Sequence, residues 1–155
     1  MTSNFRIQLD DLSGQAICDL ITFHLNDMAS VSPPESCHAL SVDTLKQDNI
    51  SVWSVWDGEQ LAGCGALMEL DAQHGEIKSM RTAPAYVGQG VAAQLLQHIL
   101  QVAKERSYQR LSLETGSTIE FVAARRLYDK FGFTECGPFA DYIPDPLSTF
   151  MTITL

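Results

Sequence analysis

The chain has 155 residues, of which 45% are hydrophobic and 19% are charged, as in an ordinary globular protein. This length is typical of one domain and suffices to bury a core without disulfides, so we expect a single domain over residues 1–155. The formal net charge of −9 repels phosphate backbones and argues against a nucleic-acid partner. An amine substrate fits this charge, although a solvated acidic surface would produce the same value.

Two further features concern the cellular compartment and metals. No apolar run approaches the roughly 20 residues of a membrane-spanning helix, and the first residues lack the features of a secretory signal. We therefore expect a cytoplasmic protein with no membrane partner. Cys18, Cys37, Cys64 and Cys136 form no C-x-x-C pair and no zinc-like spacing with histidine, so we expect reduced thiols and no bound metal.

The first half of the chain predicts a strand and a helix, followed by three antiparallel strands. Apolar and polar residues alternate over 5–9, whereas apolar residues recur at helical spacing between Ile17 and Met28. Asp57-Gly58 between two alternating runs is a strong hairpin signal, and a second turn is expected at 73–75. In chain order we expect a strand at 5–9, a helix at 17–28, a short helix at 42–47 and strands at 50–56, 61–70 and 76–82.

The second half of the chain changes to a helical period after Gly90. An apolar stripe from Val91 to Ala103 predicts a helix of several turns. The strands before and after this helix must lie close to parallel, because a right-handed crossover joins them. The order predicts an α+β fold with one mixed sheet and helices on its faces. In chain order we then expect a strand at 110–115, a helix at 119–131 that stops at Gly132, and strands at 133–136 and 150–155.

A glycine-bearing loop joins the strand at 76–82 to the helix that follows. Pro84 ends the strand, and Gly88 and Gly90 precede the helix. Glycines let the backbone approach a ligand closely, and free N–H groups at the positive end of a helix bind phosphate. The loop is therefore a candidate phosphate or pyrophosphate site, although a plain turn and helix start would show the same Gly-x-Gly.

The stretch from Pro84 to Leu96 resembles the central motif of the GNAT acetyltransferases. That motif is a proline turn followed by R/Q-x-x-G-x-G/A and a helix that carries paired leucines in its first turns. Gly88, Gly90 and Ala92 match the pattern, and Val87 stands where the family usually has Arg or Gln.

A second stretch, Ala124 to Phe133, resembles the family's A-x-x-L-Y-x-x-x-G-F segment, and its spacing from the first motif suits the family. Phe121 lies near the position where the family often has Asn. The resemblance covers Glu76 to Cys136 well and the N-terminal third only in the order of its elements. Glu135 to Tyr142 also resembles the corresponding segment of one uncharacterised bacterial branch of the family.

The resemblance to GNAT N-acetyltransferases implies both a fold and an activity. The implied fold is a mixed, mostly antiparallel central sheet of about seven strands with helices on both faces, splayed between the fourth and fifth strands. The implied activity is transfer of an acetyl group from acetyl-CoA to a primary amine of a small molecule, amino acid or peptide, by direct attack in a ternary complex. This chemistry needs no covalent cysteine and no metal. Dimers are common among relatives, so by analogy a homodimer stays open.

The resemblance also implies how the chain would hold acetyl-CoA. In this family the glycine-bearing loop binds the CoA pyrophosphate largely through main-chain amides. The pantetheine would pair with exposed strand backbone in the splay of the sheet, as if it were an added strand. The implied acetyl-CoA contacts are Met80, Arg81, Thr82, Val87, Gly88, Gln89, Gly90, Val91, Ala92, Ala93 and Tyr128.

Three residues are candidates for proton transfer. Tyr128 matches the family's frequent acid, because a phenol can protonate a thiolate of similar basicity, although a helix tyrosine can also simply pack. Glu76 stands on a strand where several members carry a base, and Glu114 near the end of the neighbouring strand is its rival. Carboxylates at strand ends are often merely exposed, so both assignments stay open.

The family builds its acceptor pocket from the first helices and the late hairpin. In this sequence the corresponding candidates are His24, Asn26, His38, Asp141 and Tyr142. A histidine on an amphipathic helix is more often a structural residue than a ligand, so packing is the alternative role for His24.

Two alternatives to an enzyme stay open. The same fold could hold an acyl-CoA as a non-catalytic binding or sensor module, which the departures at Val87 and Phe121 permit. An unrelated α+β domain would require both motif matches to arise by chance at compatible spacing. Tyr128 and the two strand-end carboxylates favour the enzyme.

Overall fold

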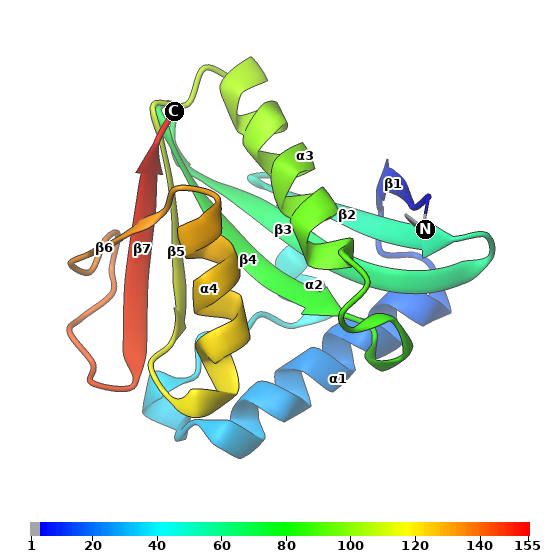
Figure 1. The fold of residues 1–155 in the computed structure, drawn as a ribbon, viewed down its shortest axis with the longest axis horizontal. Coiled ribbons are helices and arrows are strands. Elements are labelled where there is room, and N and C mark those ends of the chain that lie inside the picture. Colours follow the sequence, from blue (N-terminus) through cyan, green and yellow to red (C-terminus); the bar gives the residue numbers. More distant parts are fainter. Residues whose placement is uncertain (1–3) are drawn as a thin grey trace.

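One seven-stranded sheet with helices on both faces makes up the computed structural model, which describes residues 4–155 (Figure 1). The strands are β1 Arg6–Leu9, β2 Ile50–Asp57, β3 Gln60–Asp71, β4 His74–Thr82, β5 Arg110–Gly116, β6 Thr134–Cys136 and β7 Ser148–Thr154. The helices are α1 Gln15–Val31, α2 Val42–Leu45, α3 Val91–Glu105 and α4 Val122–Lys130, with short 3-10 turns η1 Pro34–Ser36, η2 Pro84–Tyr86 and η3 Ile119–Phe121.

The strand order in the sheet is β1-β2-β3-β4-β5-β7-β6. Neighbouring strands are antiparallel except β4 and β5, which are parallel because α3 carries the chain back between them. β7 lies between β5 and β6, so the last strand of the chain closes the gap beside β5. The prediction of a mixed, mostly antiparallel sheet is confirmed.

The pairing of β4 with β5 ends before either strand does. The paired residues run from His74 with Arg110 to Ile77 with Leu113, whereas β4 continues to Thr82 and β5 to Gly116. Beyond that point the two strands part, and backbone groups in the middle of the sheet lack a strand partner on one side. The predicted splay between the fourth and fifth strands is confirmed.

A bulge in β4 accompanies this parting. Between the pairs Cys64 with Arg81 and Ala66 with Lys78, β4 contributes one residue more than β3, and Ser79 there adopts a positive φ of 55°. An extra residue in one strand bends that strand and re-aims the side chains around it. The bulge therefore turns the end of β4 at the place where β5 leaves it.

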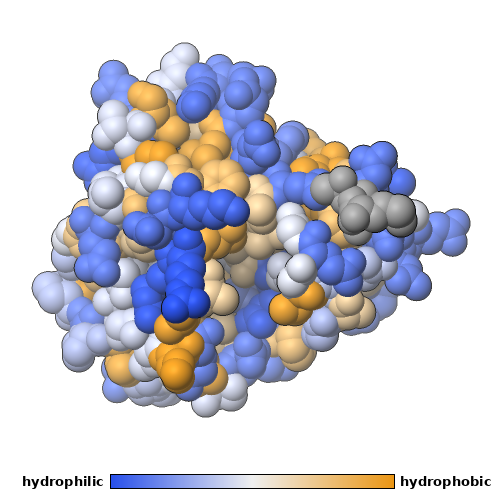
Figure 2. All heavy atoms as spheres, viewed as in Figure 1, coloured by the Kyte–Doolittle hydropathy of each residue, from blue (hydrophilic) through white to orange (hydrophobic). Residues whose placement is uncertain are grey.

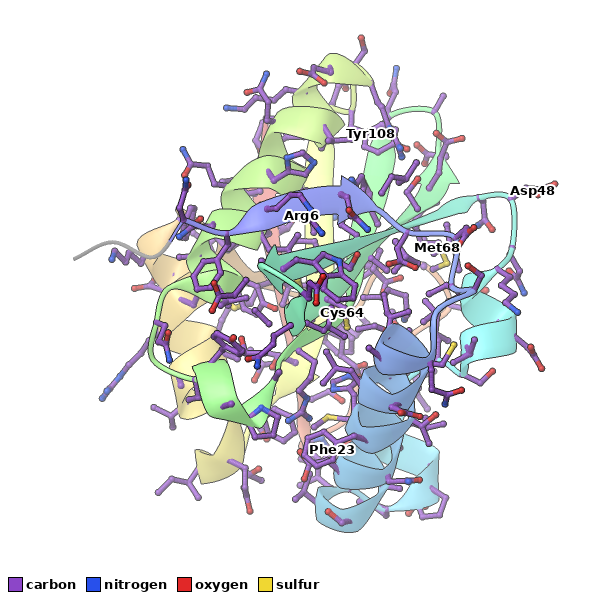
Figure 3. The ribbon with its side chains drawn as sticks, turned by 90° about the vertical axis from the view of Figure 1, so that its right-hand side faces the viewer. Arg6, Phe23, Asp48, Cys64, Met68 and Tyr108 are labelled. Atoms are coloured by element: carbon purple, nitrogen blue, oxygen red, sulfur yellow. The ribbon has the colours of Figure 1, made fainter. Side chains whose placement is uncertain are left out.

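Two hydrophobic cores lie on the two faces of the sheet. On one face α3 buries Leu95, Leu96 and Ile99 completely or nearly so. On the other face α1 buries Ile17 and Ile21 in a separate cluster. The side view shows α3 and α1 on opposite sides of the strands (Figure 3), and on the α3 face hydrophobic residues gather around a hollow while hydrophilic residues cover the periphery (Figure 2).

Several element boundaries differ by one to three residues from those that the sequence predicted, and two of these differences have a clear local form. The turn between β3 and β4 occupies residues 72–73, not 73–75, because Asp71 pairs with His74 and its carboxylate accepts the Gln73 N–H at 2.8 Å. The helix expected at 119–131 begins as the 3-10 turn at Ile119–Phe121 and is α-helical only from Val122.

The structure also bears on the cysteines and on membranes. Cys18, Cys37, Cys64 and Cys136 are free thiols. Among residues 4–155 no helix combines the length and the apolar character that crossing a bilayer requires.

The α3 core gives a stability test. Leu96→Ala should lower the free energy of unfolding by about 2–5 kcal/mol, because Leu96 is fully buried and the change leaves a cavity. Gln97→Ala, on the exposed side of the same helix, should change it by no more than about 0.5 kcal/mol. Urea denaturation of both variants checks this, and similar losses in the two would contradict the assigned core.

Candidate active site

A cavity of about 550 Å³ opens where β4 and β5 part. Its walls come from both faces of the sheet: the ends of β4 and β5, the inner side of α1, the segment after η1, and α4. Most of the predicted site residues line it, namely Met80, Arg81, Thr82, Val87, Ala92 and Tyr128 among the donor contacts, and His24, His38, Glu76, Glu114 and Tyr142 on the other side. One cavity thus brings together residues that the sequence assigned to donor binding, proton transfer and acceptor binding.

The glycine-bearing loop forms the start of α3. Gly88 and Gly90 have φ values of 83° and 85°, a region that favours glycine, and Gly90 is the N-cap of α3 without a side-chain cap. Nothing lies within 4 Å of where a side chain would begin at either glycine. The first N–H groups of a helix have no partner within that helix, so this end presents free donors and a positive dipole to open space. Such an end suits a phosphate or pyrophosphate.

Tyr128 reaches the cavity from α4. Its ring is 6% exposed and packs edge-on against Phe133, with the ring centres 5.7 Å apart. Burial raises the pKa of Tyr128 far above its usual 10, so the phenol keeps its proton at neutral pH. At neutral pH the hydroxyl can therefore donate a hydrogen bond and does not act as a base.

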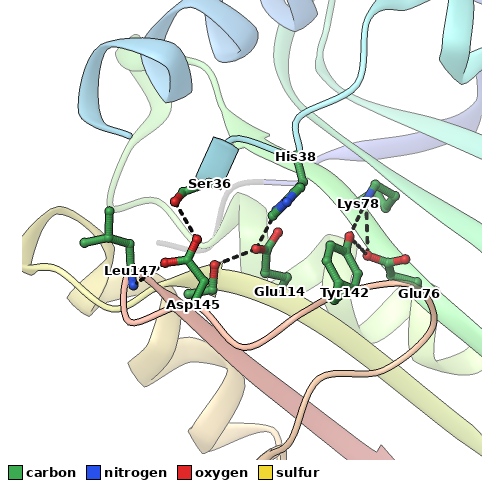
Figure 4. A network of polar contacts seen from close by, with 9 residues as sticks. Ser36, His38, Glu76, Lys78, Glu114, Tyr142, Asp145 and Leu147 are labelled. Carbon is green, nitrogen blue, oxygen red and sulfur yellow. Dashed lines mark hydrogen bonds and ion pairs between the residues drawn. The ribbon is translucent and has the colours of Figure 1, made fainter. Parts of the chain in front are cut away.

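Glu76 is held in a buried polar cluster with two neighbours (Figure 4). The Tyr142 hydroxyl donates to Glu76 Oε2 at 2.5 Å, and Lys78 Nζ lies 3.1 Å from the same oxygen. Lys78 also donates to the Tyr142 oxygen at 2.8 Å, so the three groups close a triangle. Burial, followed by the charge of Glu76, raises the pKa of Tyr142 far above its usual value, which keeps this phenol a donor.

Glu114 belongs to a second cluster at the start of the splay (Figure 4). His38 Nδ1 lies 2.7 Å from Glu114 Oε2, and the Ser148 hydroxyl donates to that oxygen at 2.7 Å. Nearby, the Ser36 hydroxyl donates to Asp145 at 2.5 Å, and this bond lowers the pKa of Asp145. These contacts fasten the segment after η1 to β5 and to the loop before β7.

Arg81 turns its side chain toward α1. Its Nε donates to His24 Nδ1 at 2.8 Å, its NH2 group donates to Asp27 at 2.7 Å, and it stacks over Phe23, which Figure 3 labels on α1. Burial and then the Arg81 charge lower the pKa of His24 to about 4, so this imidazole is neutral at physiological pH. The resemblance implied that Arg81 contacts acetyl-CoA through its backbone. In the structure its side chain also adds a cation to the α1 wall of the cavity.

The remaining predicted residues lie elsewhere. Asn26 on α1 and Asp141 before β7 are exposed and are not among the residues that line the cavity. Val91, the first residue of α3, is buried. Gly88, Gln89, Gly90 and Ala93 lie on the loop and first turn of α3, next to the lining residues Val87 and Ala92.

Sequence reasoning missed several side chains of the site. Lys78 follows Glu76 by two positions on one strand, so strand alternation alone places both on one face. Asp27 follows His24 by three positions on a helix, which likewise predicts a shared face. Asp145 and Ser148 carry no comparable signal, because their partners lie far away in the chain.

A metal site needs several ligating side chains close together. In the part of the chain that the structure describes, no group of three or more His, Cys, Asp or Glu side chains could hold a metal ion.

His24 gives a pH test. A histidine whose pKa is depressed in the folded state contributes stability that is present above its usual 6.5 and is lost as the pH falls through about 4. Between pH 7.5 and pH 5 this residue should account for a loss of about 2 kcal/mol in the free energy of unfolding. His24→Asn keeps an acceptor for Arg81 but does not titrate, so its urea midpoint should fall less over this range. Parallel pH profiles for the two proteins would contradict the depressed pKa.

Comparison with known proteins shows which family this chain is similar to. The model of the acetyltransferase (GNAT) family matches residues 19–133. The chain is 56% identical over 146 residues to the uncharacterised N-acetyltransferase YsnE of Bacillus subtilis (strain 168), covering 94% of this chain and 97% of that protein. It is 54% identical over 151 residues to the uncharacterised N-acetyltransferase YedL of Escherichia coli (strain K12), covering 97% of this chain and 95% of that protein.

A solved structure shows the same fold. A GNAT family acetyltransferase from Elizabethkingia anophelis, with acetyl-CoA bound, superposes with a TM-score of 0.74 at 19% identity, covering 99% of this chain and 100% of that one. The family match, the relatives and the splayed sheet confirm the resemblance found in the sequence, and this chain belongs to the GNAT family of N-acetyltransferases.

Proposed function

We propose that this protein transfers an acetyl group from acetyl-CoA to a primary amine of a small molecule, amino acid or peptide, by direct attack in a ternary complex. The observation that carries the proposal is a single cavity at the splay, with the open end of α3 beside it and Tyr128, Glu76 and Glu114 in its walls. Anion binding and proton transfer are the two tasks that this reaction sets the protein.

The residues present fit acetyl-CoA. The start of α3 offers free N–H groups and open space at Gly88 and Gly90 for a pyrophosphate. The segment from Met80 to Thr82 pairs with β3 on one side, and its other side borders the cavity and can pair with the amide groups of pantetheine, as an edge strand pairs with an added strand. The bound acetyl-CoA of the Elizabethkingia anophelis protein supports the same donor for this fold.

In the proposed chemistry, the two proton transfers take place on opposite sides of the cavity. The amine nitrogen forms a bond to the acetyl carbon while the carbon–sulfur bond breaks. Tyr128, which matches the family's frequent acid, donates a proton to the leaving thiolate. A base on the α1 side receives the proton that the nitrogen loses, and the cation Arg81 and the anions Glu76 and Glu114 give that side mixed charge.

The second candidate is a non-catalytic acyl-CoA-binding or sensor module on the same fold. Two side chains near the proposed acetyl-CoA site favour this module. Val87 is 70% exposed and brings no cation to the loop, and the apolar Phe121 lines the cavity. Binding without turnover would support this module, whereas turnover with an amine supports the transferase.

Donor binding can be tested with one added charge. Ala92→Glu puts a carboxylate on the lining of the cavity in the first turn of α3 and should weaken acetyl-CoA binding by about tenfold or more. Gln97→Glu adds the same charge on the exposed side of α3 and should leave the affinity unchanged. Calorimetric titration measures both, and equal affinities would contradict the proposed pyrophosphate site.

Removing the Tyr128 hydroxyl tests the acid. Tyr128→Phe should lower kcat by about 10²- to 10⁴-fold, because the thiolate then leaves without a proton. The affinity for acetyl-CoA should stay close to that of the wild type, since the ring remains buried. Thiol release from acetyl-CoA with an amine reports kcat, and a wild-type kcat in this variant would exclude Tyr128 as the acid.

A further inference from the structure

The base of the reaction has to face the opening between β4 and β5, because the thioester and the amine meet there. Glu114 is the first residue of β5 after the last pair, Ile77 with Leu113. Leu113 packs in the α3 core, so by strand alternation Glu114 points to the α1 side of the sheet. Glu114 also lines the cavity. Its carboxylate thus marks the acceptor side of the splay at its first open position.

His38 lies directly beside this carboxylate. The distance from His38 Nδ1 to Glu114 Oε2 is 2.7 Å, and the imidazole, 34% exposed, lines the cavity (Figure 4). A carboxylate accepts the proton of Nδ1, and this selects the tautomer in which Nε2 is an unprotonated acceptor. One ring nitrogen is therefore anchored and the other remains able to take a proton.

Several contacts hold the imidazole in place. The Ser148 hydroxyl donates to the same Glu114 oxygen at 2.7 Å, which orients the carboxylate. The Tyr142 ring packs edge-on against His38, with the ring centres 5.1 Å apart. Two residues before His38, Ser36 is bonded to Asp145. A side chain held in this way loses little freedom when a substrate arrives.

Glu76, the other candidate base, has a different environment. It pairs with Ser112, inside the part of the sheet where β4 and β5 are still joined, and it is 1% exposed. Its Oε2 already accepts hydrogen bonds from Tyr142 and Lys78. Glu76 therefore acts as the anchor of Tyr142 and Lys78 at the back of the cavity.

We propose that His38 is the catalytic base and that Glu114 is the residue that positions it, an inference that rests on the acetyltransferase function proposed above. His38 Nε2 takes the proton that the acceptor nitrogen loses as the nitrogen–carbon bond forms. The carbon–sulfur bond breaks, and the thiolate takes a proton from Tyr128. Solvent returns one proton to Tyr128 and receives one from His38, so the products are the acetylated amine and free CoA thiol.

Several charged and polar groups surround His38. Glu114 faces it from β5, and Tyr142 and Asp145 face it from the loop before β7. Lys78 and Glu76 lie behind Tyr142. The Glu114 carboxylate stabilises the positive charge that develops on the imidazole as it takes the proton, so its neutralisation should lower kcat.

The test compares histidine variants of the whole chain. His38→Gln should lower kcat/KM by about 10²- to 10⁴-fold with spermidine, glycinamide or lysine as the amine, while calorimetric acetyl-CoA affinity stays within about twofold. His38→Ala should regain part of its rate with added imidazole. Glu114→Gln should lower kcat more than it changes KM. His98→Gln, on α3 beside Trp53, is the matched control and should keep wild-type rates.

Each other outcome has a definite meaning. A wild-type rate in His38→Gln would overturn the role of His38, while leaving the transferase function in place. Loss of rate in both His38 variants without imidazole rescue of His38→Ala would make His38 structural and would also overturn it. Acetyl-CoA binding by the wild type without thiol release with any of these amines would overturn the transferase function itself, and the inference with it.

Discussion

The parting of β4 and β5 is the constraint on which the site depends. Because pairing stops at Ile77 and Leu113 while both strands continue, backbone polar groups in the middle of the sheet border a cavity instead of a neighbouring strand. Ser79, at the bulge, has a positive φ, and its buried hydroxyl has no hydrogen-bond partner among residues 4–155. Strained and unpartnered groups of this kind cost stability, and they persist where a ligand completes them.

The same opening divides the chemistry between the two faces of the sheet. The loop with Gly88 and Gly90 and the buried phenol of Tyr128 come from the α3 and α4 side. The carboxylates Glu76 and Glu114 come from the α1 side, where the sheet meets the segment after η1. In the proposed reaction, an acceptor on one face and acetyl-CoA on the other would meet only in the splay. This arrangement explains why one cavity contains both sets of residues.

Local patterns predicted the elements well, because periodicity and turn chemistry act over a few residues. The stripe from Val91 to Ala103 is α3, and Asp57-Gly58 is the β2–β3 turn. The β3–β4 turn was expected one residue too late at its start and two too late at its end, since the Asp71 carboxylate that fixes it is a side-chain effect outside the hydrophobic pattern. The splay, and the grouping of the candidate acetyl-CoA contacts beside it, were expected from the family resemblance alone, because no local pattern predicts either of them.

Contacts across the chain could not be predicted from local patterns. His38 and Glu114 are 76 positions apart, and Tyr142 and Glu76 are 66 apart, so only the folded sheet reveals that they touch. Sequence reasoning named all four residues but gave no reason to pair them. It also left Glu76 and Glu114 as equal candidates for the base, and their surroundings now distinguish them. Glu76 is buried among hydrogen-bond donors, whereas Glu114 contacts the His38 imidazole.

The hydrogen bond between Ser36 and Asp145 joins segments 109 positions apart, and it lies on the side of the cavity that is proposed to hold the acceptor. The loop at the start of α3 is built from a separate, contiguous part of the chain. Substitutions in η1, in the segment after it and in the loop before β7 can therefore reshape this wall of the cavity while the loop with Gly88 and Gly90 stays intact. If the proposed function holds, evolution can change the acceptor amine by substitutions in these surface segments, with the acetyl donor unchanged.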